Sequence, residues 1–149
     1  MFTRSTKAAL AASLFAAIAV LNVPQAQAQE AGEVSVTFSG MRAVQGALFV
    51  GVYDNEAAFA GGQPVDGFRL AVDSDTVGKS IKGLKPGRYA IKVYHDVDGD
   101  GRMNTNAFGI PTEPYAASNN APSTMGPPNW SDAAFEVTAD GAVQSIVIN

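Results

Sequence analysis

The chain has 149 residues, with ten lysines and arginines against fourteen aspartates and glutamates, and its formal net charge is −4 at pH 7. It contains no cysteine, which excludes disulfide bonds, a thiolate metal site and a catalytic thiol. An acidic chain is also a poor partner for nucleic acid and for anionic membranes, whereas it is compatible with divalent cations. We therefore expect a divalent cation among the partners and no nucleic acid.

Residues 1–28 have the pattern of a secretory signal peptide. Arg4 and Lys7 give a positive start, an apolar run follows them, and a small-x-small cleavage site ends at Ala28. The alternative is a transmembrane anchor, but the run is rich in alanine and shorter than the roughly 20 apolar residues that a membrane span needs. We therefore expect a single mature domain at residues 29–149, periplasmic or secreted, with no membrane insertion after cleavage.

The rest of the sequence has β periodicity. Val34, Val36 and Phe38 alternate with polar residues, as in a half-buried strand, and residues 46–53 are apolar on both faces, as in a strand that is covered on both sides. Further strand patterns follow at residues 68–72, 77–84, 88–95, 135–137 and 143–148. We also expect a single helical turn at 55–59, and a hairpin turn at Asp140-Gly141 between the last two strands. These strands, about seven in number, predict an all-β fold: a single antiparallel β-sandwich of transthyretin-like or immunoglobulin-like type with one long irregular loop.

The inward-facing residues of these strands define the expected core. The strand at 88–95 alternates most cleanly, because every second residue from Tyr89 to His95 shares one face, and it follows a type II turn signal at Pro86-Gly87. The long loop begins where this strand ends. The residues that we expect to face inward are Val34, Val36, Phe38, Leu48, Val50, Val52, Phe68, Leu70, Tyr89, Ile91, Val93, Phe135 and Val137.

The long loop opens with Asp96, Asp98 and Asp100, followed by a glycine. Carboxylates at every second position before a glycine are the first half of a calcium-binding loop, in which a short backbone curls several oxygens around one hard cation. The twelfth position of that pattern holds a closing glutamate, but here it is Ala107, so Glu113 would have to reach back instead. The candidate ligands are Asp96, Asp98, Asp100, the backbone carbonyl of Arg102, Asn104 and Glu113.

Calcium is the preferred cofactor, ahead of magnesium, because the candidate oxygens are many and the loop is flexible. Closely spaced carboxylates would also repel one another without a cation. The alternative is that the Asp, Asn and Gly residues only build turns, with the aspartate side chains accepting hydrogen bonds from nearby N–H groups. Both interpretations stay open.

Several motifs give the chain a family resemblance. They are Tyr94-His95-Asp96, an Asn/Asp/Gly-rich loop, Gly109-Ile110-Pro111-Thr112-Glu113-Pro114-Tyr115, Ser118-Asn119-Asn120, Pro127-Pro128-Asn129-Trp130 and the strand from Phe135 to Val137. In these segments the chain resembles the bacterial family called domain of unknown function 2141, over nearly all of the mature sequence. One departure is Ala116-Ala117, where the family has Gly-Phe. The resemblance implies an exported β-sandwich and, because the family carries no assigned reaction, no particular activity.

Three functions remain compatible with the sequence. The first, which accounts for the loop most directly, is an exported non-catalytic binding or structural module whose loop is organised by calcium. The second is a carbohydrate- or peptide-binding sandwich that reads its ligand with Tyr115, Asn119, Asn120 and Trp130. The third is a metal-dependent or acid/base hydrolase centred on His95, Asp96 and Glu113.

The hydrolase is the least favoured of the three. A single histidine and no cysteine make a poor ligand set for a transition metal. A lone histidine at the end of an inward-facing strand more often bonds the backbone of a loop than acts as a base.

Overall fold

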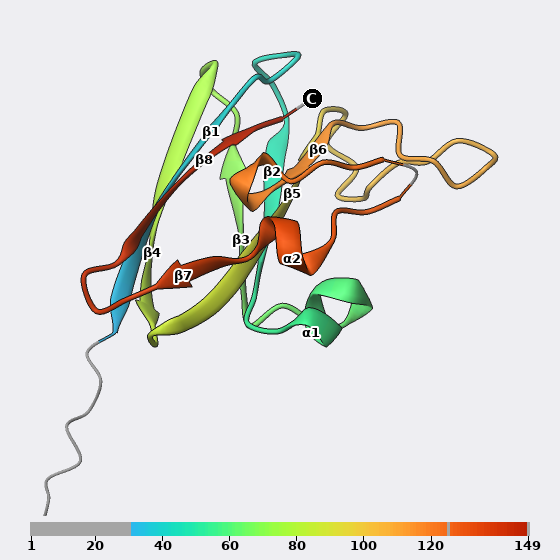
Figure 1. Ribbon diagram of the computed structural model, residues 1–149. Coiled ribbons are helices and arrows are strands. Elements are labelled where there is room, and N and C mark those ends of the chain that lie inside the picture. The colour runs from blue at the N-terminus through green and yellow to red at the C-terminus, as the bar shows by residue number, and fades with distance from the viewer. Residues whose placement is uncertain (1–30, 125, 149) are drawn as a thin grey trace, which may run out of the picture.

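The computed structural model describes residues 31–124 and 126–148 (Figure 1). The expected signal peptide at residues 1–28 lies outside these described residues. Within them, no helix combines the length and the apolar character that crossing a membrane requires.

The described chain is mostly β, as the sequence predicts, and its helices are short. The strands are β1 (Gly32–Ser39), β2 (Ala47–Tyr53), β3 (Asp66–Ala71), β4 (Thr76–Leu84), β5 (Gly87–Asp96), β6 (Tyr115–Ala117), β7 (Phe135–Val137) and β8 (Ala142–Val147). The helices are α1 (Glu56–Gly61), the 3₁₀ turn η1 (Ser118–Asn120) and α2 (Trp130–Ala133). Helix α1 begins where the Asn55 side chain accepts a hydrogen bond from the Ala58 N–H at 2.9 Å.

The strands form two sheets, one of three strands in the order β4-β1-β8 and one of five strands. In the five-stranded sheet the order is β3-β2-β5-β6, and β7 also pairs with β5. Figure 1 shows the sheets as two layers, with the short helices and the long loop gathered on the side of the five-stranded sheet. The sequence analysis missed β6, η1 and α2, because it assigned all of these residues to the loop.

The predicted hairpin between the last two strands is wrong. β7 pairs with β5 in one sheet and β8 pairs with β1 in the other, so the turn at Asp140-Gly141 carries the chain across the core. The β1–β8 pair is parallel, which also corrects the expectation of a purely antiparallel fold. Gly141 is needed at this crossing, because its φ is +89° and a Cβ there would lie 2.2 Å from the Glu33 carbonyl oxygen.

Both sheets contribute their inner faces to one buried cluster. Nearly all of the expected core residues belong to it, and Ile81, Ile146 and Ile148 join them. Phe68 and Leu70 are only partly buried, because β3 is the edge strand of its sheet. Burial of this cluster is the main source of stability in a chain without disulfides.

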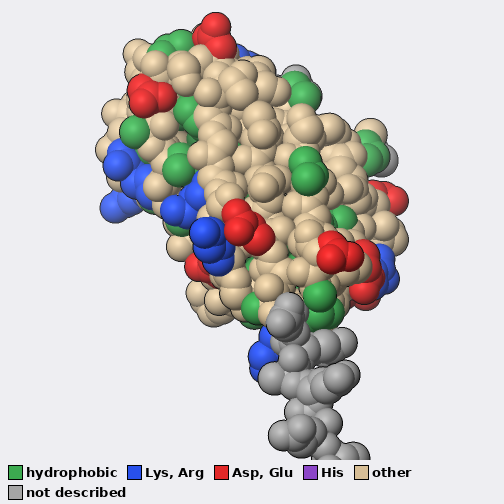
Figure 2. Space-filling model, turned by 90° about the vertical axis from the view of Figure 1, so that its left-hand side faces the viewer, with side chains coloured by type: hydrophobic (Ala, Val, Ile, Leu, Met, Phe, Trp, Pro, Cys, Tyr) green, Lys and Arg blue, Asp and Glu red, His purple; other side chains and the backbone are tan. Residues whose placement is uncertain are grey.

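The outer face of the three-stranded sheet is mostly polar, although β8 exposes Val143 on it opposite Ser35. Its central strand, β1, presents Glu33, Ser35 and Thr37 to solvent, and β4 presents Ser80 opposite Ser35. Figure 2 looks onto this side of the molecule, where apolar side chains appear only as separate small patches. Single exposed apolar residues are normal on a protein surface and indicate no binding site here.

Candidate functional site: an aromatic groove and the aspartate loop beside it

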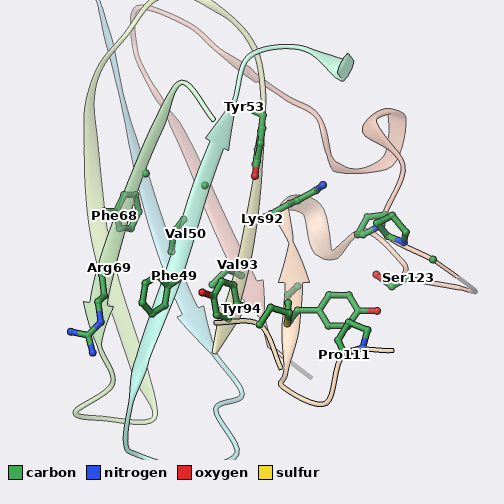
Figure 3. Close-up of a pocket in the computed structure, with 18 of the residues that line it drawn as sticks. Phe49, Val50, Tyr53, Phe68, Arg69, Lys92, Val93, Tyr94, Pro111 and Ser123 are labelled. Carbon is green, nitrogen blue, oxygen red and sulfur yellow. The ribbon is translucent and has the colours of Figure 1, made fainter. Parts of the chain in front are cut away.

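The outer face of the five-stranded sheet carries a row of large side chains. Phe49 of β2 lies opposite Arg69 of β3 on one side and Tyr94 of β5 on the other, and Tyr94 lies opposite Tyr115 of β6. The Phe49 and Tyr94 rings are stacked, with centroids 5.1 Å apart and planes 8° from parallel, and the Arg69 guanidinium lies 5.7 Å from the Phe49 centroid. Figure 3 shows Phe49 and Tyr94 side by side on this face. Cross-strand pairing therefore assembles one continuous aromatic row.

The neighbouring row of the same face is made of small residues and one lysine. Gly51 lies opposite Gly67 on one side and Lys92 on the other. Because Gly51 has no Cβ, the Tyr53 ring can lie along the sheet above it: a Cβ at Gly51 would be 2.9 Å from the Tyr53 hydroxyl oxygen. The sheet thus has a low floor next to its aromatic row.

Lys92 extends from this floor toward helix α1. Its ammonium group donates a hydrogen bond to the Phe59 carbonyl and lies 4.2 Å from the Phe59 ring centroid and 5.4 Å from that of Tyr53. Burial lowers the pKa of Lys92, because desolvation disfavours its charged form. The side chain is a partly desolvated cation held over aromatic rings.

A groove of about 1160 Å³ lies over this face. Its floor is the outer face of β2, β3 and β5, and its other wall comes from residues 109–111, Ser123 and residues 126–128, with Pro111 and Ser123 on that side in Figure 3. Among the described residues that line it, Arg69 and Lys92 are the charged ones, and there is no carboxylate and no amide side chain. A concave, mostly apolar surface of this size is typical of a ligand site.

The aspartate loop lies at the end of β5, beside the groove. Asp96 is only 1 % exposed, and its two carboxylate oxygens accept hydrogen bonds from the N–H groups of Gly99 at 2.8 Å and Gly101 at 3.0 Å. Both glycines have positive φ, which lets the backbone turn its N–H groups toward the carboxylate. The first turn of the loop is therefore wrapped around Asp96.

Glu113 returns from the far end of the loop to its beginning. The side chain is 8 % exposed, and its oxygens accept hydrogen bonds from the N–H groups of Val97 at 3.0 Å and Asn104 at 3.2 Å. The loop is also tied at its base, where the His95 N–H donates to the Pro114 carbonyl at 2.8 Å. Glu113 thus fixes both ends of the loop against each other.

The structure brings together part of the predicted ligand set. Asp96, Asp98 and Glu113 each offer one carboxylate oxygen, and these oxygens lie within 4.8 Å of one another. Asp100 stands outside this group, with one oxygen accepting from the Arg102 N–H at 2.8 Å. All three converging donors are oxygens, which suits a hard cation such as calcium or magnesium.

The remaining predicted ligands take part in other contacts. The Asn104 side-chain amide donates a hydrogen bond to Asp98 at 2.9 Å, so its nitrogen, not its oxygen, faces that carboxylate. Arg102 contacts Asp100 through its backbone N–H. Local turn bonds of this kind are what the Asx-turn interpretation predicts, and they coexist with the three converging carboxylates.

His95 is fully buried, and its ring contacts the backbone of a neighbouring segment. Its Nε2 lies 2.8 Å from the Gln45 carbonyl oxygen and therefore carries the proton that it donates there. Its Nδ1 has no hydrogen-bond partner among the described residues.

Tyr94 joins the aspartate loop to the groove. Its ring belongs to the aromatic row, and its hydroxyl donates to the Gly101 carbonyl at 3.4 Å. Burial, followed by the nearby carboxylates of Asp96, Glu113 and Asp100, raises the pKa of the Tyr94 phenol. Tyr94 therefore contacts both the aspartate loop and the groove.

The polar and aromatic residues that the sequence analysis offered as ligand readers mostly have structural contacts. Asn119 bonds Gln144 and the carbonyls of Asp132 and Ala134, and Asn120 bonds the backbone of β8. Trp130 packs against Phe59, with ring centroids 5.8 Å apart. Of that set, only Tyr115 lines the groove.

Sequence reasoning missed the aromatic row, although the signal for it was present. Residues 46–53 are apolar on both faces, which predicts a cover on both sides of β2. The core covers one side, but the other side, with Phe49, faces the groove.

The family model described as "Uncharacterized protein conserved in bacteria (DUF2141)" matches residues 36–145. No curated protein and no solved structure matches the chain.

Proposed function

This chain belongs to the DUF2141 family, and we propose that it is an exported, non-catalytic binding module in which calcium organises the loop beside the groove. The observation that carries the proposal is the return of Glu113 to Asp96 and Asp98, which gathers three carboxylate oxygens within 4.8 Å of one another. Two of these carboxylates are almost fully buried. Buried like charges at this spacing are costly, and a divalent cation would offset that cost.

We propose that the two sheets form a single β-sandwich of transthyretin-like or immunoglobulin-like type. The single core cluster to which both sheets contribute supports this assignment. The rigid inner face would then hold β5 in place, so that the loop at its end and the groove on its outer face keep fixed positions.

Calcium binding at this site is expected to be weak. Calcium takes six to eight oxygens, whereas three carboxylates converge and Ala107 replaces the glutamate that would close the shell. Sites in extracellular modules have dissociation constants of roughly 10⁻⁴ to 10⁻³ M, which suits a protein outside the cytoplasm. We place the protein in the periplasm or in the secreted fraction on the pattern of residues 1–28. Sequencing the N-terminus of the protein from its host should give a mature chain that starts at Gln29, and an intact Met1 would contradict export.

The carboxylates support the non-catalytic interpretation over the hydrolase. Asp96 and Glu113 each accept two backbone N–H bonds, and His95 donates to the Gln45 carbonyl. Groups that are already engaged in this way hold a loop in place, and none of the three is positioned to exchange a proton with a bound substrate.

The test is thermal unfolding with chelator and with millimolar calcium. Because calcium would bind the folded state only, a concentration ten times the dissociation constant adds about 1.4 kcal/mol, or a few degrees in Tm. Asp98→Asn removes one converging carboxylate at an exposed position and should abolish this shift. Asp140→Asn, in the distant turn before β8, is the matched control and should keep the shift. An equal Tm for the wild type in both buffers would reject the calcium site and leave the loop as a set of turns.

A further inference from the structure

We propose that the groove binds a small amphipathic organic anion, with its apolar body against the aromatic row and its carboxylate beside Lys92. The inference rests on the proposed binding function and names the class of ligand. It goes beyond the aspartate loop, because it assigns a second site on the opposite side of Tyr94 from the carboxylates.

The apolar part of the ligand is indicated by the shape and lining of the groove. Phe49 and Tyr94 form a flat stacked surface, and Pro111 faces it from the loop wall, as Figure 3 shows. Gly67, which lines the groove and has no side chain near its Cβ position, leaves room above the floor beside the Tyr53 ring. An aliphatic or aromatic body placed between these walls would remove apolar surface from water on both of its sides.

The anionic part is indicated by charge. The chain as a whole is acidic, with a net charge of −4, yet the charged residues that line the groove are two cations and no carboxylate. Of these two cations, Lys92 is the one whose pKa burial lowers. It has no ion-pair partner, because the only ion pair among the described residues is between Lys82 and Glu33 at 3.8 Å. A carboxylate beside Lys92 would restore the stabilisation that its cation loses by desolvation.

Two other kinds of ligand fit the groove less well. A neutral sugar needs carboxylate or amide side chains that accept and donate hydrogen bonds, and the described lining offers none. An extended peptide lying across the floor would gain affinity from main-chain hydrogen bonds, but the central floor strand β2 is already paired on both sides, with β3 and β5, and only the edge of the sheet at β3 could accept one. A small anion requires neither.

The experiment is isothermal titration calorimetry of the purified full-length mature protein with three probes of equal chain length: decanoate, decanol and decyltrimethylammonium. We expect decanoate to bind most tightly, decanol more weakly and the cationic probe least. Lys92→Met keeps the length and the apolar stem of the side chain and removes the charge, and it should weaken decanoate binding about tenfold or more while sparing decanol. Lys82→Met, on the other sheet and 76 % exposed, is the matched control and should leave all three affinities unchanged.

A second variant tests the location independently of charge. Gly67→Val places a β-branched side chain, which suits a strand, on the outer face of β3 within the groove. It should abolish binding of decanoate and decanol while the protein still unfolds cooperatively. Equal affinity for the three probes, or decanoate binding that survives both Lys92→Met and Gly67→Val, would overturn the proposal.

The occupant and the calcium site are distinguished by separate measurements. Sedimentation of the free protein should show a monomer, because a dimer that decanoate does not dissociate would mean that a second copy fills the groove, which also overturns the proposal. Calcium stabilisation without decanoate binding would reject the ligand assignment alone. Decanoate binding without calcium stabilisation would reject the calcium-organised loop and leave the groove assignment standing.

Discussion

The two sheets share one core, but the side chains on their outer faces differ in polarity. On the three-stranded sheet, Ser35 lies opposite Ser80, and Thr37 lies opposite Ser145. On the five-stranded sheet the equivalent central position is Phe49, which lies between Arg69 and Tyr94. Ala90 and Ala117 on the five-stranded sheet belong to a second buried cluster with Phe59, but Phe49 belongs to neither buried cluster, so packing of the core does not require an aromatic residue at that position.

The two outer faces also differ in whether loops cover them. The polar face meets solvent directly (Figure 2), whereas residues 109–111, Ser123 and residues 126–128 line the groove over the aromatic face. Tyr94 then connects that face to the aspartate loop through its bond to Gly101. The aromatic face is therefore the side on which substitutions should change ligand binding, and the polar face is the natural control.

The largest expected effect is on the free energy of unfolding, and it compares a core position with a solvent-facing position on the same strand. Phe38 points into the core and Thr37 points to solvent, one residue away on β1. Phe38→Ala should lower the free energy of unfolding by about 3 to 5 kcal/mol, because it leaves a cavity in the cluster that both sheets share. Thr37→Ala should change it by less than about 1 kcal/mol. Urea denaturation measures both, and equal effects would mean that β1 is out of phase.

An intermediate effect is expected for the stacked pair on the aromatic face. A double-mutant cycle on Phe49 and Tyr94, each changed to Ala, should give a coupling energy of about 0.5 to 1.5 kcal/mol, since the two ring centroids lie 5.1 Å apart and the planes are nearly parallel. The same cycle on Ser35 and Ser80 should give a value near zero, within about 0.3 kcal/mol. If the two cycles agree, the aromatic row contributes no more to stability than the polar row does.

The smallest expected effect is the pH dependence that Lys92 gives to the free protein. Burial lowers the pKa of Lys92 in the folded state from its ordinary value of 10.5. The unfolded chain therefore binds this proton more tightly, so the lysine opposes folding at neutral pH and opposes it less as pH rises. Wild type should therefore gain stability relative to Lys92→Met as pH rises toward 10.5.

Urea denaturation at several pH values measures this trend, with Lys82→Met as the control at an exposed position. A difference between wild type and Lys92→Met that stays constant with pH would show that Lys92 is well solvated, and it would weaken the case for an anion at that position.

Much of the inner architecture follows from local pattern. The alternation of Val34, Val36 and Phe38 gives the phase of β1 correctly, and the clean alternation up to His95 gives that of β5. The turn at Asp140-Gly141 shows where the pattern stops being informative, because a turn signal is local and does not say whether its two flanking strands pair with each other. Strand β6 has three residues, too few for any periodicity to appear.

The site is only partly readable from the sequence for a similar reason. The spacing of Asp96 and Asp98 predicts a turn lined with carboxylates, and the possibility that Glu113 reaches back was open from the start. Whether an individual carboxylate points inward depends on which N–H groups its own turn offers, and the Arg102 N–H draws one oxygen of Asp100 away from the others. The aromatic row is set by strand register, which single-sequence patterns do not determine.

The parallel pairing of β1 with β8 has a consequence for how the chain folds. Partners such as Val34 and Ala142 lie at opposite ends of the domain sequence, so this ladder has a very high contact order and must close a long loop before it gains any contact. Hairpin neighbours such as β2 and β3 can meet early, whereas Ile146 and Ile148 fill the core only after β8 has been synthesised. Until then one edge of β1 is open and the core is incomplete. The chain can therefore reach its native core only when its last strand is available, which would suit the export that we propose.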